Sequence, residues 1–120
     1  MTPKESALAV AKALDSKKAG DLKVLETSDV TTLADYFVIC TATSSAQVKA
    51  LADLCEETMK NLGEEPHHIE GHRGGVWVLL DYVSVVIHIF MPEAREFYNL
   101  EHLWGDAVPV DLSGVLAQPE

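Results

Sequence analysis

The sequence has no long apolar run and few cysteines. No stretch reaches the roughly 20 apolar residues that a membrane-spanning helix needs, and the N-terminus lacks the basic and apolar regions of a signal peptide. We therefore expect a cytoplasmic protein. The two cysteines, Cys40 and Cys55, fall within a strand-like and a helix-like apolar pattern, which predicts two buried thiols in preference to a disulfide.

Positive charge is also scarce. Nine lysines and arginines stand against nineteen aspartates and glutamates, which gives a formal net charge of −10. An acidic surface repels phosphate groups, and we find no basic patch: Lys17 and Lys18 lie where a helix should end, a position that the helix dipole explains. We therefore expect no direct binding to nucleic acid, whereas a basic protein would be attracted.

The 120 residues are enough for one domain with a single core. Capping signals and helical spacing of apolar residues predict three helices, which begin at Pro3, after Ser44 and at Met91, and end before Gly20, at Gly63 and at Gly105. Strands are predicted at residues 22–26, 36–42, 67–70 and twice within 75–90. The order predicts an α/β fold: a single domain at residues 1–105 with a mixed sheet of about five strands flanked by helices, then a C-terminal tail at 106–120.

Residues 75–90 consist of two β-branched and aromatic runs around a short polar break, which predicts a β-hairpin. With Tyr82 and Val83 at its tip, Asp81 would lie opposite Ser84, Leu79 opposite Val86 and Trp77 opposite His88. The opposite face would be purely aliphatic and would form core: Val76, Val78, Leu80, Val85, Ile87 and Ile89. The face that carries Trp77, Leu79, Asp81 and His88 is mixed, as surfaces that meet a partner often are.

The sequence offers little that could carry chemistry. His67, His68, Glu70 and His72 are the strongest metal candidates, but three ligands spaced along one strand spread over ~13 Å, too far to surround one ion. We therefore expect no metal and no cofactor. An acid–base pair of Asp81 and His88 would lack a nucleophile, and no phosphate-binding loop is present.

Several separate segments, in order, resemble the ribosomal silencing factor family, also called Iojap-related proteins. They are residues 35–48 (DYFVICTATSSAQV), Glu70-Gly71, 77–82 (WVLLDY), 85–90 (VVIHIF), and 95–98 (REFY) followed by Leu100-Glu101 and Leu103-Trp104. The resemblance covers most of residues 4–110. It implies a fold related in topology to nucleotidyltransferases but without catalysis. It also implies binding to the large ribosomal subunit through ribosomal protein L-fourteen, which blocks subunit joining and represses translation when nutrients are scarce, and a role in large-subunit assembly.

The resemblance directs attention to the mixed hairpin face as the partner-binding surface. We expect Trp77, Leu79, Asp81, His88 and Tyr98 to contact the ribosomal protein. Helical spacing instead predicts core positions for Phe97 and Trp104.

Two other functions stay open. The same hairpin could serve a dimerisation or adaptor module, including a homodimer of the free protein, and a nucleotidyl-transfer or metal-assisted enzyme is the third hypothesis.

At the hairpin tip the chain departs from the family, which usually has Gly-Asp where Val83-Ser84 stands here. A β-branched residue disfavours the positive φ that such a tip normally needs, so we expect either another turn type or ~1 kcal/mol or more of strain.

Overall fold

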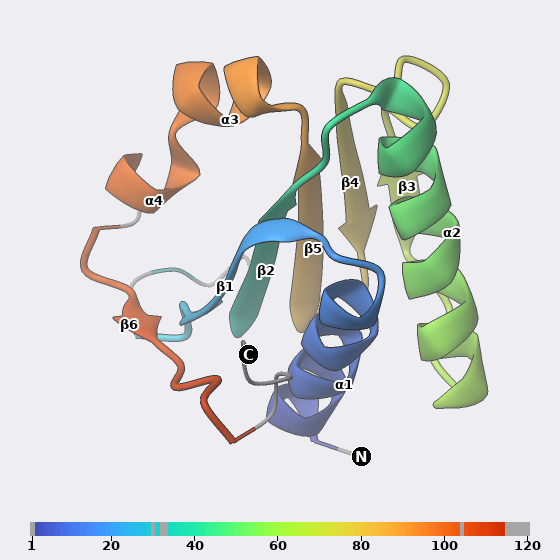
Figure 1. Ribbon diagram of the computed structural model, residues 1–120. Helices are drawn as coiled ribbons and strands as arrows, with labels where there is room; N and C mark the ends of the chain where they lie inside the picture. Colours follow the sequence, from blue (N-terminus) through green and yellow to red (C-terminus); the bar gives the residue numbers. More distant parts are fainter. Residues whose placement is uncertain (1, 30, 32–33, 104, 115–120) are drawn as a thin grey trace.

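The computed structural model describes residues 2–29, 31, 34–103 and 105–114 (Figure 1). The elements follow in the order α1 (Pro3–Ser16), β1 (Gly20–Glu26), β2 (Tyr36–Thr41), α2 (Ser45–Asn61), β3 (His68–Glu70), β4 (Trp77–Asp81), β5 (Val85–Phe90), α3 (Pro92–Tyr98), α4 (Leu100–Leu103) and β6 (Val108–Pro109). The first eight elements confirm the predicted order. None of the described helices is long and apolar enough to cross a membrane.

Within the described residues, all the strands join one mixed sheet in the order β3-β4-β5-β2-β1-β6. β2 and β5 run parallel, and every other neighbouring pair is antiparallel. The sheet has six strands where about five were predicted, because β6 pairs with β1 through Leu25 and Glu26. β6 belongs to the segment expected to be a tail, so the sheet continues past residue 105.

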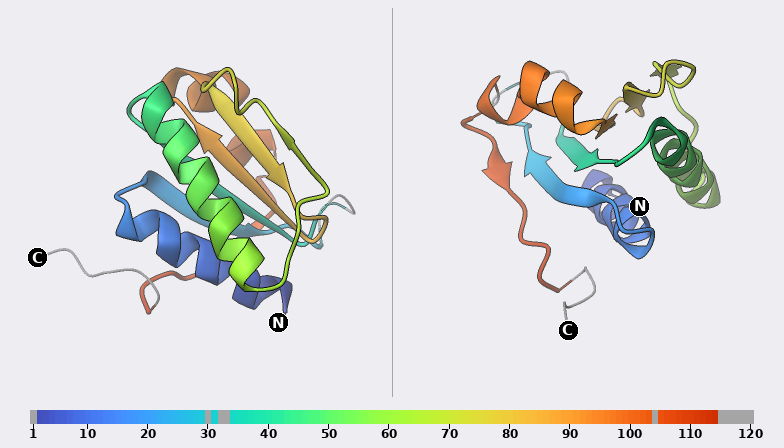
Figure 2. Two further views of the ribbon diagram at one scale, coloured as in Figure 1. Left: turned by 90° about the vertical axis from the view of Figure 1, so that its right-hand side faces the viewer. Right: turned by 45° about the horizontal axis from the view of Figure 1, so that its top comes forward.

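α1 and α2 lie side by side on one face of the sheet, with α1 over β1 and β2 and α2 over β4 and β5 (Figure 2). A capping box begins α1, since the Thr2 hydroxyl accepts from the Glu5 amide while the Glu5 carboxylate accepts from the Thr2 amide. The larger core lies between these helices and the sheet. β2 is buried on both faces between β1 and β5, which confirms the central strand predicted from its continuous apolar run.

Both thiols lie in this larger core. Cys40 on β2 and Cys55 on α2 are free and buried, as predicted. Burial raises the pKa of Cys40 to about 12 and the pKa of Cys55 well above its ordinary value. Neither sulfur is therefore a thiolate at neutral pH.

The opposite face of the sheet has a thinner cover, in which Ala94 of α3 packs with Phe37, Ile39 and Phe90, as do Ala34 and Ala107 from two other parts of the chain. One continuous helix was predicted here, and that prediction is wrong. Asn99 adopts a left-handed conformation (φ 44°) and divides the segment into α3 and α4. The core position predicted for Trp104 lies outside the described residues.

The hairpin of β4 and β5 forms, but its predicted register is wrong by two residues. Trp77 pairs with Phe90, Leu79 with His88 and Asp81 with Val86, so the two loop residues are Val83 and Ser84. A shift of two leaves every side chain on its predicted face, because strand side chains alternate with a period of two. The aliphatic face is core except at Val76, which precedes β4 and is 54% exposed.

Candidate protein-binding surface

Trp77, the first residue of β4, is held by contacts from three other side chains. Its indole Nε1 donates a hydrogen bond to Nδ1 of His88 (3.2 Å). Its ring stacks on Phe90 with centroids 5.1 Å apart and meets Tyr98 of α3 at 4.5 Å. The indole is only partly buried, so one part of a rigidly placed aromatic ring faces solvent. Aromatic residues fixed in this way bind a partner at low entropic cost.

His88 supports Trp77 from inside the sheet and does not reach the surface. It is 4% exposed, packs edge-on against Phe37 and lies over Phe90. Because an indole N–H can only donate, Nδ1 is the acceptor and the proton of His88 sits on Nε2. Burial lowers the pKa of His88 to about 4, so the ring is neutral at neutral pH. His88 can therefore contribute to binding only through the Trp77 that it holds.

Leu79 and Asp81 continue the row of Trp77 along β4, and both are partly exposed. Across the pair with the edge strand β3, Leu79 lies opposite Glu70 and Asp81 opposite His68. His68 Nδ1 is 3.5 Å from Asp81 Oδ2, and its Nε2 is 3.8 Å from Glu70 Oε2. This face of the sheet thus places the apolar side chains of Trp77 and Leu79 beside the carboxylates of Asp81 and Glu70.

Asp81 also shapes the hairpin tip. Its Oδ1 accepts a hydrogen bond from the Val83 amide (2.7 Å), and the Ser84 amide donates to the Tyr82 carbonyl (2.9 Å). These contacts hold Val83 at φ 70°, in the left-handed region that a β-branched residue disfavours. The substitution of Val for the expected glycine has therefore left the tip with a positive φ and its strain.

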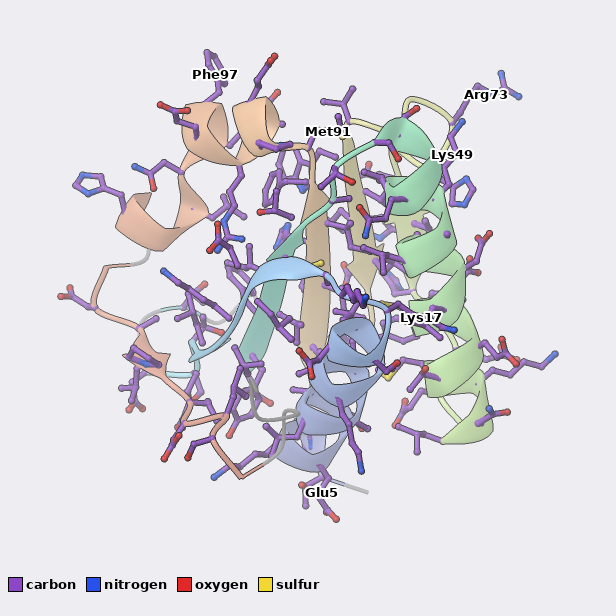
Figure 3. All side chains as sticks on the ribbon, viewed as in Figure 1. Glu5, Lys17, Lys49, Arg73, Met91 and Phe97 are labelled. Atoms are coloured by element: carbon purple, nitrogen blue, oxygen red, sulfur yellow. The ribbon has the colours of Figure 1, made fainter. Side chains whose placement is uncertain are left out.

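Two neighbouring aromatic residues extend the surface onto α3. Tyr98 is half-exposed beside Trp77, and Phe97 meets Tyr98 with ring centroids 5.1 Å apart. Phe97 was predicted to be core, but it is 80% exposed and its ring points away from the body of the molecule (Figure 3). α3 ends at Tyr98, whereas the spacing predicted one helix up to Gly105 with Phe97 on its buried side, so the sequence alone did not identify Phe97. We call Trp77, Leu79, Asp81, Phe97 and Tyr98 the β4–α3 surface.

Two of the histidines considered as metal ligands, His68 and His72, contact different partners. His72 Nε2 lies 2.9 Å from Asp53 Oδ1 on α2, whereas His68 faces Asp81 and Glu70. Within the described part of the chain no group of three or more His, Cys, Asp or Glu side chains is placed to hold a metal ion. Asp81 faces His68 and not His88, so the acid–base pair considered from the sequence does not form.

The geometry of this surface suits protein binding. It presents rigid aromatic rings and a leucine bordered by carboxylates, on a molecule of net charge −10. Apolar area with aromatic anchors supplies affinity, and the surrounding negative charge favours a basic partner.

Comparison with known proteins adds independent information. The family model described as "Ribosomal silencing factor during starvation" matches residues 1–120. The ribosomal silencing factor of Halalkalibacterium halodurans is 40% identical over 105 residues, which cover 88% of this chain and 90% of that protein. A mouse protein named mitochondrial assembly of ribosomal large subunit protein 1 is 35% identical over 94 residues, 76% of this chain and 41% of the mouse protein. A crystal structure from Chromobacterium violaceum superposes with a TM-score of 0.85 at 33% identity and covers 100% of this chain and 92% of that one.

Proposed function

The chain belongs to the ribosomal silencing factor family, and we propose that it binds the large ribosomal subunit in the cytoplasm, blocks joining of the small subunit and so represses translation under nutrient limitation. The proposed contact is ribosomal protein L-fourteen, as the family resemblance implied. No catalysis is part of this function. The name of the mouse relative supports a second role in assembly of the large subunit.

The observation that carries the proposal is the fixed, partly exposed Trp77, whose ring Tyr98 of the β4–α3 surface contacts. Its ring is held between His88, Phe90 and Tyr98, so little rotamer freedom is left to lose on binding. Leu79 follows Trp77 on the same face of β4, and Tyr98 contacts the indole from α3, so both extend the apolar area. We propose that Trp77, Leu79 and Tyr98 contact the partner directly, that Asp81 attracts its basic side chains, and that His88 acts by orienting Trp77.

Charge complementarity favours a ribosomal protein over ribosomal RNA as the direct contact. Ribosomal proteins are typically basic, and a molecule with net charge −10 is attracted to a basic protein and repelled by phosphate. Long-range attraction of this kind accelerates association and is screened by salt. The association rate should therefore fall as ionic strength rises, while the dissociation rate changes less.

Sedimentation of purified subunits with the protein tests the proposal. Added protein should reduce the fraction of joined ribosomes and should sediment with the large subunit. Trp77→Ala should weaken binding about 30-fold or more, because a central aromatic anchor is worth about 2–4 kcal/mol. Val108→Ala is the control, since Val108 is an apolar residue that is 54% exposed, more than Trp77, and lies on β6, at the far edge of the sheet from β3.

The outcomes separate the competing functions. Joining that is unchanged at high excess of protein would refute the proposal. Self-association in light scattering that is lost in Trp77→Ala, without any binding to subunits, would instead assign the β4–α3 surface to a homodimer. Circular dichroism must show that Trp77→Ala still folds, since the ring also packs on Phe90.

A further inference from the structure

α3 carries two residues of the β4–α3 surface but has little of its own to hold it in place. It is seven residues long, and its N-cap residue Met91 makes no side-chain capping hydrogen bond. Of the seven residues, all of them described, only Ala94 is buried. An isolated helix of this length is not stable in water. The positions of Phe97 and Tyr98 therefore depend on tertiary contacts made elsewhere on the helix.

Arg95 makes such contacts with two strands. Its Nη1 donates to the main-chain carbonyl of Asp21 in β1 (2.6 Å) and to the hydroxyl of Thr41 at the end of β2 (2.8 Å). These partners are 74 and 54 residues away in the sequence. Hydrogen bonds from a guanidinium are charge-assisted and directional, so together they fix both the position and the rotation of α3.

The chain is locally distorted where it receives Arg95. The register of β1 against β2 is interrupted between Gly20 and Lys23, and Asp21 within this bulge has φ 41°. Asp21 thus lies outside the regular ladder, which leaves its carbonyl available to the guanidinium. A non-glycine residue in this conformation is strained and persists only where its surroundings hold it. The bulge and Arg95 form one structural unit.

The surroundings of Arg95 do not suit an anionic ligand. A hollow of about 280 Å³ opens here, at the carboxyl ends of the parallel strands β2 and β5, where α/β sheets often bind small molecules. However, Asp21 and Glu96 line it together with Arg95, and the whole chain carries a charge of −10. A phosphate or carboxylate would therefore be repelled.

We propose that Arg95 is a positioning residue, which fixes α3 on the bulge of β1 and thereby places Tyr98 against Trp77 for partner binding. The proposal rests on the function proposed above. Tyr98 lies about one helical turn beyond Arg95, so any rotation of α3 changes the 4.5 Å contact between the rings of Tyr98 and Trp77. Arg95 acts on the partner through these rings and does not itself touch it.

Nuclear magnetic resonance of the Trp77 indole N–H tests the proposal directly. The chain has two tryptophans, so a Trp104→Phe background leaves one indole signal. Arg95→Ala should shift this signal, because the nearby Tyr98 ring moves. It should also accelerate hydrogen exchange of the Asn99 amide, which closes the last turn of α3, at least 10-fold, and should weaken binding to large subunits at least 10-fold. Arg95→Lys should restore part of each effect.

Two further variants and a control keep the test decisive. Thr41→Val removes one acceptor and should give a smaller change in the same direction, which is informative if Arg95→Ala fails to fold. Asp21→Gly keeps the main-chain carbonyl and should retain the wild-type indole signal. Lys12→Ala removes an exposed cation from α1, on the other face of the sheet, and should change nothing.

Each outcome decides the role of Arg95 separately from the proposed function. An unchanged indole signal and unchanged exchange in Arg95→Ala would overturn the proposal. Weaker binding with an unchanged signal would also overturn it, since Arg95 would then contact the partner. If the wild-type chain does not bind large subunits, the proposed function fails, but the indole and exchange measurements still decide whether Arg95 positions α3.

Discussion

Replacing Val83 by glycine should stabilise the protein. Val83 occupies the tip of the β4–β5 hairpin with φ 70°, and the hydrogen bonds of its amide to Asp81 and of Ser84 to Tyr82 hold it there. Its branched side chain crowds the backbone in this conformation, whereas glycine adopts it freely. Val83→Gly should therefore remove strain without changing the path of the chain.

The size of the effect follows from three contributions. Relief of a left-handed β-branched residue is worth about 2–3 kcal/mol. The side chain is 61% exposed, so its loss costs only about 0.6 kcal/mol of apolar burial. The greater freedom of glycine in the unfolded chain costs about 0.7 kcal/mol more. The net gain is about 1 kcal/mol, which corresponds to a rise of about 4 °C in Tm for a domain of this size.

Urea and thermal unfolding at pH 7 measure this gain. Val83→Ala keeps a Cβ at the same φ and should gain less than Val83→Gly. The matched control is Val76→Gly, because Val76 is similarly exposed but lacks a positive φ, so this variant should lose about 0.5–1 kcal/mol. If Val83→Gly is no more stable than the wild type while Val76→Gly behaves as stated, the strain assigned to the tip is wrong.

Two other predictions concern His88 and Gly71. The folded-state pKa of His88 is lowered to about 4, so wild-type stability should fall by up to about 3 kcal/mol as the pH drops from 6.5 to 4, where only the unfolded chain takes up the proton. Above pH 6.5 His88 is neutral in both the folded and the unfolded chain, so it should not make stability depend on pH. In urea unfolding at several pH values, the stability of His88→Gln should fall less steeply with decreasing pH. An equal slope in the two proteins would show that the pKa of His88 is not lowered by folding. Gly71→Ala should cost more than about 2 kcal/mol in urea unfolding, because a Cβ at φ 81° would lie 2.0 Å from the Trp77 carbonyl oxygen. Gly63→Ala, with the same φ but nothing within 4 Å, should cost about 1 kcal/mol, and equal losses would show that the contact with Trp77 does not matter.

Local sequence patterns were enough to predict much of the fold. The capping residues and helical spacing of α1 and α2, and the doubly apolar run of β2, are properties that each segment carries by itself. The faces of the hairpin were also predicted correctly although its register was not. Because strand side chains alternate with a period of two, an even error in register changes partners but not faces.

The errors lie where a local pattern had two solutions. The segment after Phe90 has helical spacing throughout, but Asn99 ends α3 and leaves Phe97 exposed. A short polar side chain tolerates the left-handed conformation, and nothing in the spacing says whether it will adopt it. Similarly, the short edge strand β6 depends on pairing with β1, a residue range more than 80 positions away.

The sequence by itself determined the family, the elements of the central sheet and the face of the hairpin on which Trp77 lies, because these depend on residue type and on short-range periodicity. Only the tertiary structure decided which members of that face reach solvent. It buries His88 beneath Trp77, uses Asp81 to hold the strained tip at Val83, and brings Tyr98 against Trp77 through the contacts of Arg95 with Asp21 and Thr41. Exposure and long-range hydrogen bonds depend on residues far apart in the chain, so no local pattern could have predicted them.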